Sequence, residues 1–214
     1  FDIGVSDNKE ISANRAFFSY SEIKDFSPEY LSIPMCTNNV FSLLQKLRKN
    51  PHLSSVCNAI EGEVHMTKGK PSLTMNPKDY KLFKGVQLDR WIYKTSKADI
   101  SQGEIEFVKF DVIKNICSTE KLENIKSDRI AYQRLTGINE KHRLKAVIIP
   151  ANCFIANSAC CLKNQGIYSD KFILGWFNST LLNFVFKATS TSSNVNGYEI
   201  DALPIPSATP EPQK

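Results

Sequence analysis

The expected fold rests on the last third of the chain, which begins with Arg129-Ile130-Ala131-Tyr132-Gln133-Arg134. This run alternates between apolar and polar residues, a turn-like stretch follows over 137–141, and residues 143–149 then become increasingly apolar. Short runs with a two-residue period predict strands with one buried face. We therefore expect strand, turn and strand over 129–149, and a further short strand over 153–156.

An apolar helix candidate follows, from Phe172 to Phe186. Its apolar residues fall on nearly every side, which is typical of a helix buried against a sheet. A polar loop over 189–197 and a short extended edge over 203–206, Leu-Pro-Ile-Pro, complete the pattern. We expect four helix side chains to pack under the sheet and position the loops: Leu174, Phe177, Leu181 and Phe184.

The N-terminal part is expected to add one amphipathic helix. Residues 1–35 are polar and irregular, and we interpret them as an arm packed on the domain. Apolar residues then recur at helical spacing up to a stop at Pro51, with Thr37 or Asn38 as the N-cap. Further along the chain, residues 104–113 alternate and predict another strand with one buried face.

These elements predict an α+β fold, with a mixed or antiparallel sheet, an N-terminal amphipathic helix and a buried C-terminal helix. We expect a linker arm with the amphipathic helix over 1–50, the main domain over 51–206 and a Pro-rich tail over 207–214. A chain of 214 residues with 42% hydrophobic content can bury a core of its own. Because it begins at Phe1 without a Met, we expect it to be a processed product or an excised part of a longer protein.

Neither a membrane span nor a zinc site is predicted. The longest apolar run is interrupted at 178–180 and at Asn183, which leaves it too short and too polar to cross a bilayer. The six cysteines form no Cys-x-x-Cys pair, and the three histidines complete no ligand spacing near them. Adjacent Cys160 and Cys161 indicate buried thiols, and free thiols suit a reducing cytoplasm.

The net charge of +5 is unevenly distributed along the chain. Residues 61–150 hold seventeen basic and twelve acidic side chains, whereas the flanking regions are balanced. A basic middle region is typical of a surface that meets a polyanion. A lysine-rich solvated surface has the same composition, so charge alone leaves both interpretations open.

Three clusters contain the side chains that DNA reading requires. Cations and amides bind phosphates, while Gln and Arg make paired hydrogen bonds to adenine and guanine edges. Each residue taken alone could be an ordinary surface group, but together the clusters favour nucleic-acid binding. They are a Gly- and Pro-containing loop, a turn region and the strand–turn–strand segment, with candidates Lys68 and Lys70; Arg90, Trp91 and Lys94; and Gln133, Arg134, Asn139, Lys141, His142 and Arg143.

Several pieces occur in an order that resembles a known family. They are Gly85 with Arg90-Trp91, the 129–134 strand, the segment 176–182 with its Asn-Ser, and the closing Leu-Pro-Ile-Pro over 203–206. From about residue 50 to 206 the chain resembles the TaqI-like C-terminal specificity (target-recognition) domain. This domain occurs in adenine-specific DNA methyltransferases and in type II (IIG) restriction-modification enzymes.

The resemblance implies a DNA-binding domain of a bacterial or archaeal enzyme that is non-catalytic alone. Its partners would be double-stranded DNA and the methyltransferase domain of the same polypeptide, with no membrane. It implies no cofactor in this chain. S-adenosylmethionine, and Mg²⁺ if the parent is also an endonuclease, would belong to the parent's other domains. Family members differ in the sequences they read, so no base-reading residue can be carried over.

A search for catalytic motifs agrees with a binding role. Asn76-Pro77 lacks the second proline and the aromatic residue of an adenine methyltransferase loop, and we interpret it as a turn. The run 106–109 misses the Glu-x-Lys spacing of common nucleases by one residue. Three other functions stay open: a protein-interaction module, an enzyme with an unrecognised pocket, and an RNA-binding domain that stacks bases on Tyr93 and Tyr132.

Overall fold

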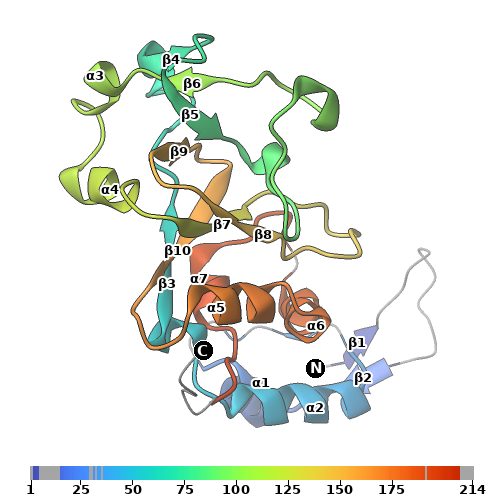
Figure 1. The fold of residues 1–214 in the computed structure, drawn as a ribbon. Helices are drawn as coiled ribbons and strands as arrows, with labels where there is room; N and C mark the ends of the chain where they lie inside the picture. Colours follow the sequence, from blue (N-terminus) through green and yellow to red (C-terminus); the bar gives the residue numbers. More distant parts are fainter. Residues whose placement is uncertain are drawn as a thin grey trace.

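The computed structural model describes residues 2–4, 15–28, 31, 33–34, 36–190 and 192–207. It confirms the α+β fold, with two four-stranded sheets and helices packed mainly at one end of the molecule (Figure 1). Most of the predicted Pro-rich tail lies outside the described residues. No helix in the described part of the chain is long and apolar enough to cross a membrane.

The first sheet is antiparallel throughout and contains the predicted strand–turn–strand. Ile130 pairs with Ile148 and Ala131 with Val147. The expectation of one buried face is wrong for β7, because Ile130 packs in one core cluster and Ala131 in another on the opposite face. The second of these strands starts three residues later than predicted, at Ala146, because the side chain of Asn183 binds the preceding backbone. The strand order is β3 (Cys57–Glu61), β10 (Ala159–Asn164), β7 (Arg129–Gln133) and β8 (Ala146–Ile149).

The second sheet is mixed and lies above the first in Figure 1. Its strand order is β4 (Leu73–Thr74), β6 (Phe107–Val108), β5 (Tyr80–Phe83) and β9 (Cys153–Ile155). Only β5 and β9 are parallel. The short strand predicted over 153–156 is confirmed. The strand predicted over 104–113 is wrong beyond two residues, because the chain turns at Lys109 and forms a short helix.

The helices show one correct prediction and one error. The amphipathic helix is present, starting after Thr37 as predicted. The prediction of a single helix over 172–186 is wrong, because this segment forms two helices, α5 (Asp170–Phe177) and α6 (Thr180–Thr189). Leu174 and Phe177 are buried as expected, whereas Leu181 and Phe184 are exposed. The helices are α1 (Tyr20–Phe26), α2 (Asn38–Arg48), α3 (Phe110–Ile113), α4 (Thr119–Asn124), α5 (Asp170–Phe177), α6 (Thr180–Thr189) and α7 (Gly197–Asp201).

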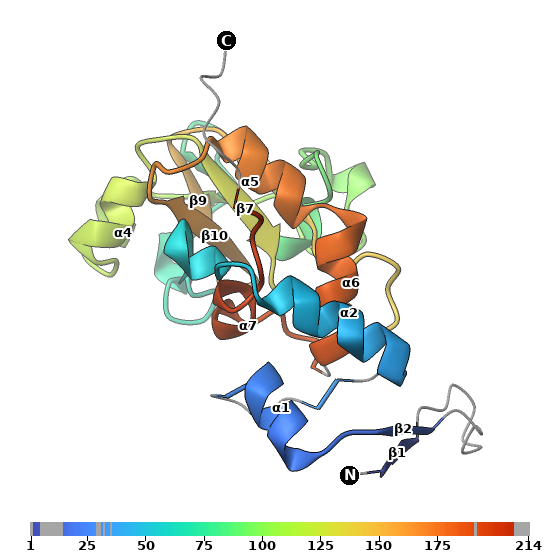
Figure 2. The same cartoon turned by 90° about the horizontal axis from the view of Figure 1, so that it is seen from below.

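The N-terminal arm is more regular than predicted. β1 (Asp2–Gly4) pairs with β2 (Arg15–Phe17), and α1 follows with a complete capping box between Ser19 and Glu22. Packing on the domain is confirmed, because Phe18 and Phe26 share a core cluster with Phe186 of the C-terminal helices. Phe18 also contacts Phe41 of α2 at a ring-centroid distance of 4.6 Å. Figure 2 shows α1 and α2 along the side of the molecule that faces the viewer.

The largest core cluster unites the two ends of the chain. It combines buried apolar residues of α1 and α2 with those of α5, α6 and α7, and with one face of the first sheet. A second cluster fills the space between the two sheets, and a third supports β5, β9 and α3. The loop between β7 and β8, toward the right of Figure 1, therefore projects from a packed scaffold.

Candidate nucleic-acid interface

Asn178, which lies between α5 and α6, binds β8, the edge strand of the first sheet. The buried Asn178 side chain accepts a hydrogen bond from the Ala146 backbone N–H at 3.0 Å and donates to the Ala146 carbonyl at 2.8 Å. Ser179 then caps α6 by accepting from the Leu182 N–H at 3.0 Å. These contacts give the Asn-Ser pair of the apolar segment a structural role that its hydrophobic pattern did not predict.

The turn region with Arg90 and Trp91 is bound to the same place. The Trp91 N–H donates to the Ala146 carbonyl at 3.0 Å, and Arg90 Nη2 donates to the Asn178 carbonyl at 2.6 Å. Within the turn, the Asp89 N–H donates to the Ile92 carbonyl at 3.0 Å. Residues 88–93 therefore form a tight, anchored loop that covers the edge of β8.

The β7–β8 loop is fixed to α6. Asn183 Oδ1 accepts from the Arg143 N–H at 2.7 Å and from the Leu144 N–H at 3.2 Å. Asn183 Nδ2 donates to the Lys141 carbonyl at 3.0 Å, and Lys187 Nζ donates to the Glu140 carbonyl at 2.9 Å. Neither Asn183 nor Lys187 was a sequence-based candidate; a polar side chain inside an apolar helix was the one signal for Asn183.

The hydrogen bonds of the 88–93 loop and of the β7–β8 loop place several positively charged side chains around His142, which is half-buried. Burial, and then the charges of Arg90, Lys141, Lys187 and Lys145 in that order, lower the pKa of His142. Glu140 is an acidic residue of the same loop, and its carboxylate forms an ion pair with Lys145. Arg90, Lys141 and Lys187 have no carboxylate partner among the described residues. We call Arg90, Lys141, His142 and Lys187 the cationic cluster.

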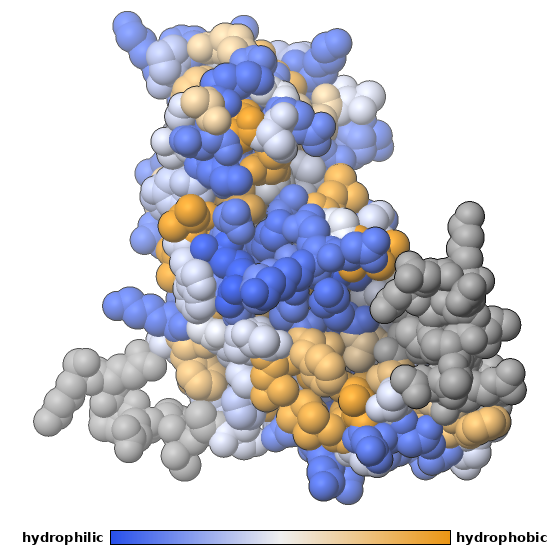
Figure 3. All heavy atoms as spheres, turned by 90° about the vertical axis from the view of Figure 1, so that its right-hand side faces the viewer, coloured by the Kyte–Doolittle hydropathy of each residue, from blue (hydrophilic) through white to orange (hydrophobic). Residues whose placement is uncertain are grey.

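Figure 3 faces the right-hand side of Figure 1 and shows a hydrophilic band across the middle of the molecule, with hydrophobic surface below it. Asn139 and Lys141 are exposed in the β7–β8 loop. Of the sequence-based candidates, Arg90 and Lys141 lie close enough to His142 for their charges to act on it, and Trp91 directly follows Arg90.

Arg143 is placed differently from its prediction as a DNA contact, because its side chain is only 1% exposed. Arg143 donates to backbone carbonyls of the 190–194 loop, including that of Ser190 at 3.2 Å, and to Thr136 Oγ1 at 3.3 Å. Its guanidinium also lies 4.8 Å from the centre of the Phe186 ring. This burial excludes a direct DNA contact and makes Arg143 a residue that positions the surrounding loops.

The other candidates are dispersed or already paired. Arg134 forms an ion pair with Glu61 and is about one-third exposed, and Gln133 is half-buried at the base of the loop. Lys94 lies 3.8 Å from Asp89. Lys68 and Lys70 are exposed, but they directly precede β4 at the far end of the molecule, away from the β7–β8 loop (Figure 1).

The aromatic candidates divide into buried and exposed. Tyr132 is fully buried against Phe177, so the expectation that it stacks RNA bases is wrong. Tyr93 packs edge-on against Phe83 with ring centroids 5.0 Å apart. Trp91 is 52% exposed and has a backbone φ of +72°. That conformation costs roughly 1–2 kcal/mol in a residue other than glycine.

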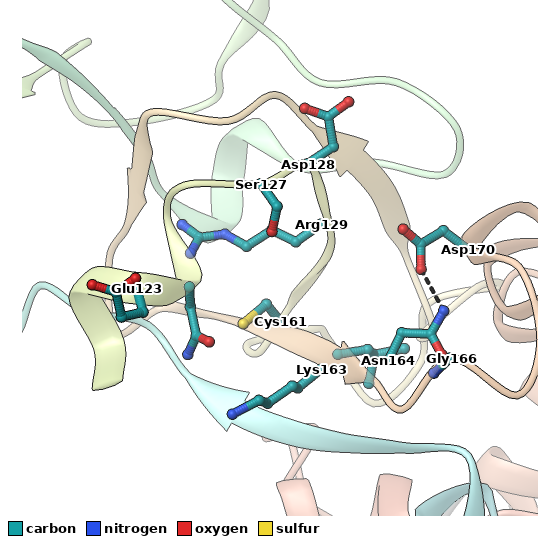
Figure 4. Close-up of a pocket in the computed structure, with 11 residues that line it drawn as sticks. Glu123, Ser127, Asp128, Arg129, Cys161, Lys163, Asn164, Gly166 and Asp170 are labelled. Carbon is teal, nitrogen blue, oxygen red and sulfur yellow. Dashed lines mark hydrogen bonds between the residues drawn. The ribbon is translucent and has the colours of Figure 1, made fainter. Parts of the chain in front are cut away.

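A separate cavity of about 550 Å³ lies between α4, β10 and the start of α5 (Figure 4). Its ionisable groups already have partners: Asp170 accepts from Asn164 at 2.7 Å, and Arg129 forms an ion pair with Glu63. Burial raises the pKa of the Cys161 thiol to about 12, so it is protonated near neutral pH. No histidine lines the cavity. The groups that line this cavity include no activated nucleophile.

No family model matches the chain, and no curated protein sequence matches it significantly.

Proposed function

We propose that this chain is a sequence-specific DNA target-recognition domain of a bacterial or archaeal restriction-modification enzyme, cytoplasmic and non-catalytic alone. A methyltransferase domain of the same polypeptide would use S-adenosylmethionine to modify adenine. The cationic cluster carries the proposal, because Arg90, Lys141 and Lys187 come from three separate elements and converge around His142 without carboxylate partners among the described residues.

Convergence of this kind suits a DNA backbone. Phosphates along a duplex present regularly spaced charges, and cations held by a rigid scaffold can bind several of them without losing much side-chain freedom. Arg90 is already fixed by the Asn178 carbonyl, and Lys187 by the Glu140 carbonyl. Both retain donors for a phosphate, since a guanidinium has five N–H groups and an ammonium has three.

Sequence reading is assigned to the loop rather than to the scaffold. Asn139 is exposed in the middle of the β7–β8 loop, two residues before Lys141 of the cationic cluster. Asn178, Asn183 and Arg143 lie beneath and hold that loop through backbone contacts. A scaffold with this arrangement permits the loop residues to change with the target while the supporting hydrogen bonds stay the same.

The direct test is selection of bound duplexes from a random-sequence library by the full chain. The proposal predicts enrichment of one short motif, with loss of enrichment in Asn139→Ala and retention in Lys171→Ala. Lys171 is an exposed residue on α5 and serves as the surface control. Duplex retention without any enriched motif would contradict sequence-specific recognition. Preferential retention of single-stranded RNA would favour the RNA-binding alternative.

The methyltransferase context needs its own test in a host that makes the full-length parent. Methylation mapping of the genome should show a short methylated motif that disappears when residues 51–206 are deleted. A motif that survives the deletion would contradict a role for this chain in choosing the site.

A protein-interaction role has one observation in its favour, the outward face of α6. Leu181 is 40% exposed and Phe184 is 38% exposed, although both belong to an otherwise buried helix. Within the proposed function, this face would meet another domain of the same polypeptide. Complete absence of duplex binding would favour the interaction module over the DNA reader.

A further inference from the structure

Trp91 combines an unfavourable backbone with an unpartnered side chain. Its φ of +72° lies in the left-handed region, which a bulky residue rarely adopts. The side chain is 52% exposed, and neighbouring Ile92 is 60% exposed. The indole has no hydrogen bond or ring contact with any residue that the structure describes. Burial in the core therefore does not explain why a tryptophan occupies this position.

The loop that displays Trp91 is held on both sides. The Trp91 N–H is bonded to the Ala146 carbonyl at 3.0 Å. The Lys94 N–H donates to the Gln87 carbonyl at 2.7 Å, and the buried Gln87 side chain donates back to the Lys94 carbonyl at 3.3 Å. Leu88 and Tyr93 form an isolated β-bridge that closes the loop. The indole is thus presented by a fixed backbone, so that little freedom would be lost on binding.

Tyr93, two residues along, provides the contrast. Its ring contacts Phe83, and Lys81 Nζ lies 5.9 Å from the ring centre. The Tyr93 ring therefore contacts other residues of the protein, whereas the Trp91 ring is available to a partner. The residue directly before Trp91 is Arg90, a member of the cationic cluster, so the available indole lies beside the surface proposed to bind phosphates.

We propose that Trp91 is a wedge that stacks on a base at an opened step of bound duplex DNA, an inference that rests on the proposed function. An indole has a large flat face that stacks on any base, and apolar side chains inserted between base pairs unstack and kink a duplex. Arg90 would hold the neighbouring phosphate while the indole enters, and Ile92 would extend the apolar edge beside it. The left-handed backbone conformation of Trp91 would then be retained, despite its unfavourable energy, because it directs the ring outward.

Two substitutions separate backbone strain from base stacking. Trp91→Gly removes the ring and tolerates the left-handed backbone, whereas Trp91→Phe retains an aromatic face. The chain contains two tryptophans, and the second, Trp176, donates its indole N–H to the Pro204 carbonyl at 2.7 Å. Trp176→Phe leaves Trp91 as the fluorescent indole. If Trp176→Phe fails to fold, subtracting the fluorescence of Trp91→Phe from that of wild type gives the fluorescence of Trp91.

The measurements are duplex affinity by anisotropy, indole fluorescence at saturating duplex and thermal stability. We expect Trp91→Gly to be at least as stable as wild type and to bind duplex about 5- to 100-fold more weakly. Trp91→Phe should stay within about threefold of wild type in affinity, because a phenyl ring still stacks. The fluorescence of Trp91 should be quenched when the duplex binds.

The outcomes distinguish this inference from the proposed function. If wild type binds duplex with salt dependence, but Trp91→Gly binds equally well and the indole is not quenched, the wedge is refuted and the DNA-binding function stands. Quenching by single-stranded RNA and not by duplex also refutes the wedge. If wild type binds no duplex at all, the proposed function itself fails and the inference fails with it.

Discussion

Removing the Arg143 side chain should destabilise the protein strongly without removing any direct DNA contact. Its guanidinium is 1% exposed and donates to the Ser190 carbonyl at 3.2 Å, Ser190 Oγ at 3.1 Å and Thr136 Oγ1 at 3.3 Å, among other acceptors. Arg143→Ala leaves these acceptors buried without a donor. Breaking a buried charged network of this kind costs about 3–5 kcal/mol of the free energy of unfolding. In a chain of this size, the melting temperature should fall by roughly 6–20 °C.

Urea denaturation and hydrogen exchange test this expectation. The free energy of unfolding should fall in Arg143→Ala, and amide exchange should accelerate across 192–196, where the loop loses its anchor. Arg143→Lys should recover part of the loss, since it keeps the charge but not the planar fork. The surface control is Arg134→Ala, whose partly exposed ion pair with Glu61 is worth less than about 1 kcal/mol. A loss below about 1 kcal/mol in Arg143→Ala would refute the positioning role.

Three further predictions concern the His142 imidazole, the Asn178 side chain and the cysteine thiols. Duplex binding should tighten as pH falls from about 7.5 to 5.5, because a phosphate raises the lowered pKa of His142 and the complex takes up a proton; His142→Gln should flatten this dependence in a titration. Asn178→Ala should cost about 2–4 kcal/mol in urea denaturation, against little change for exposed Thr180→Ala. In native protein, a thiol reagent should label half-buried Cys36 and Cys117 first, and the four buried thiols only after unfolding; fast labelling of all six would contradict the structure.

Strands and helices with a clear period were predictable from the sequence. Alternation over 129–134 and the increasingly apolar run over 143–149 located β7 and β8, because short runs of this kind favour paired strands. Helical spacing located α2 with its start after Thr37. The burial of both faces of β7 was not predictable in this way, because the second face is covered by residues of the other sheet.

The break between α5 and α6 was not predictable from hydrophobic pattern, since apolar residues continue across it. It is made by Asn178, whose side chain binds Ala146, 32 residues away in the chain. Arg143 escaped prediction for the same reason, since its acceptors belong to a loop almost fifty residues further on. Sequence spacing cannot reveal that a charged residue will be buried by partners so distant.

Two short helices had a usable local signal. Ser19 and Glu22 form a capping box at α1, and Asn196 and Glu199 form one at α7. The Ser/Asn-x-x-Glu spacing that produces these boxes is visible in the sequence. Among the candidate site residues, the sequence placed Lys141 and His142 in one cluster and Arg90 in another. Their grouping, like the contribution of Lys187, depended on how the turn region and α6 pack against the β7–β8 loop.

The salt dependence of duplex DNA binding distinguishes a phosphate-binding cationic cluster from an ordinary charged surface. Anisotropy titrations over a salt series would compare wild type, Lys141→Ala/Lys187→Ala and the control Lys78→Ala/Lys171→Ala, which removes two exposed lysines elsewhere. Each lost phosphate contact lowers the slope of log affinity against log salt by about 0.9. We expect the cluster variant to lose about 1–2 units of slope, while the control keeps the wild-type value. Equal slopes in all three proteins, or no duplex binding by wild type, would contradict it.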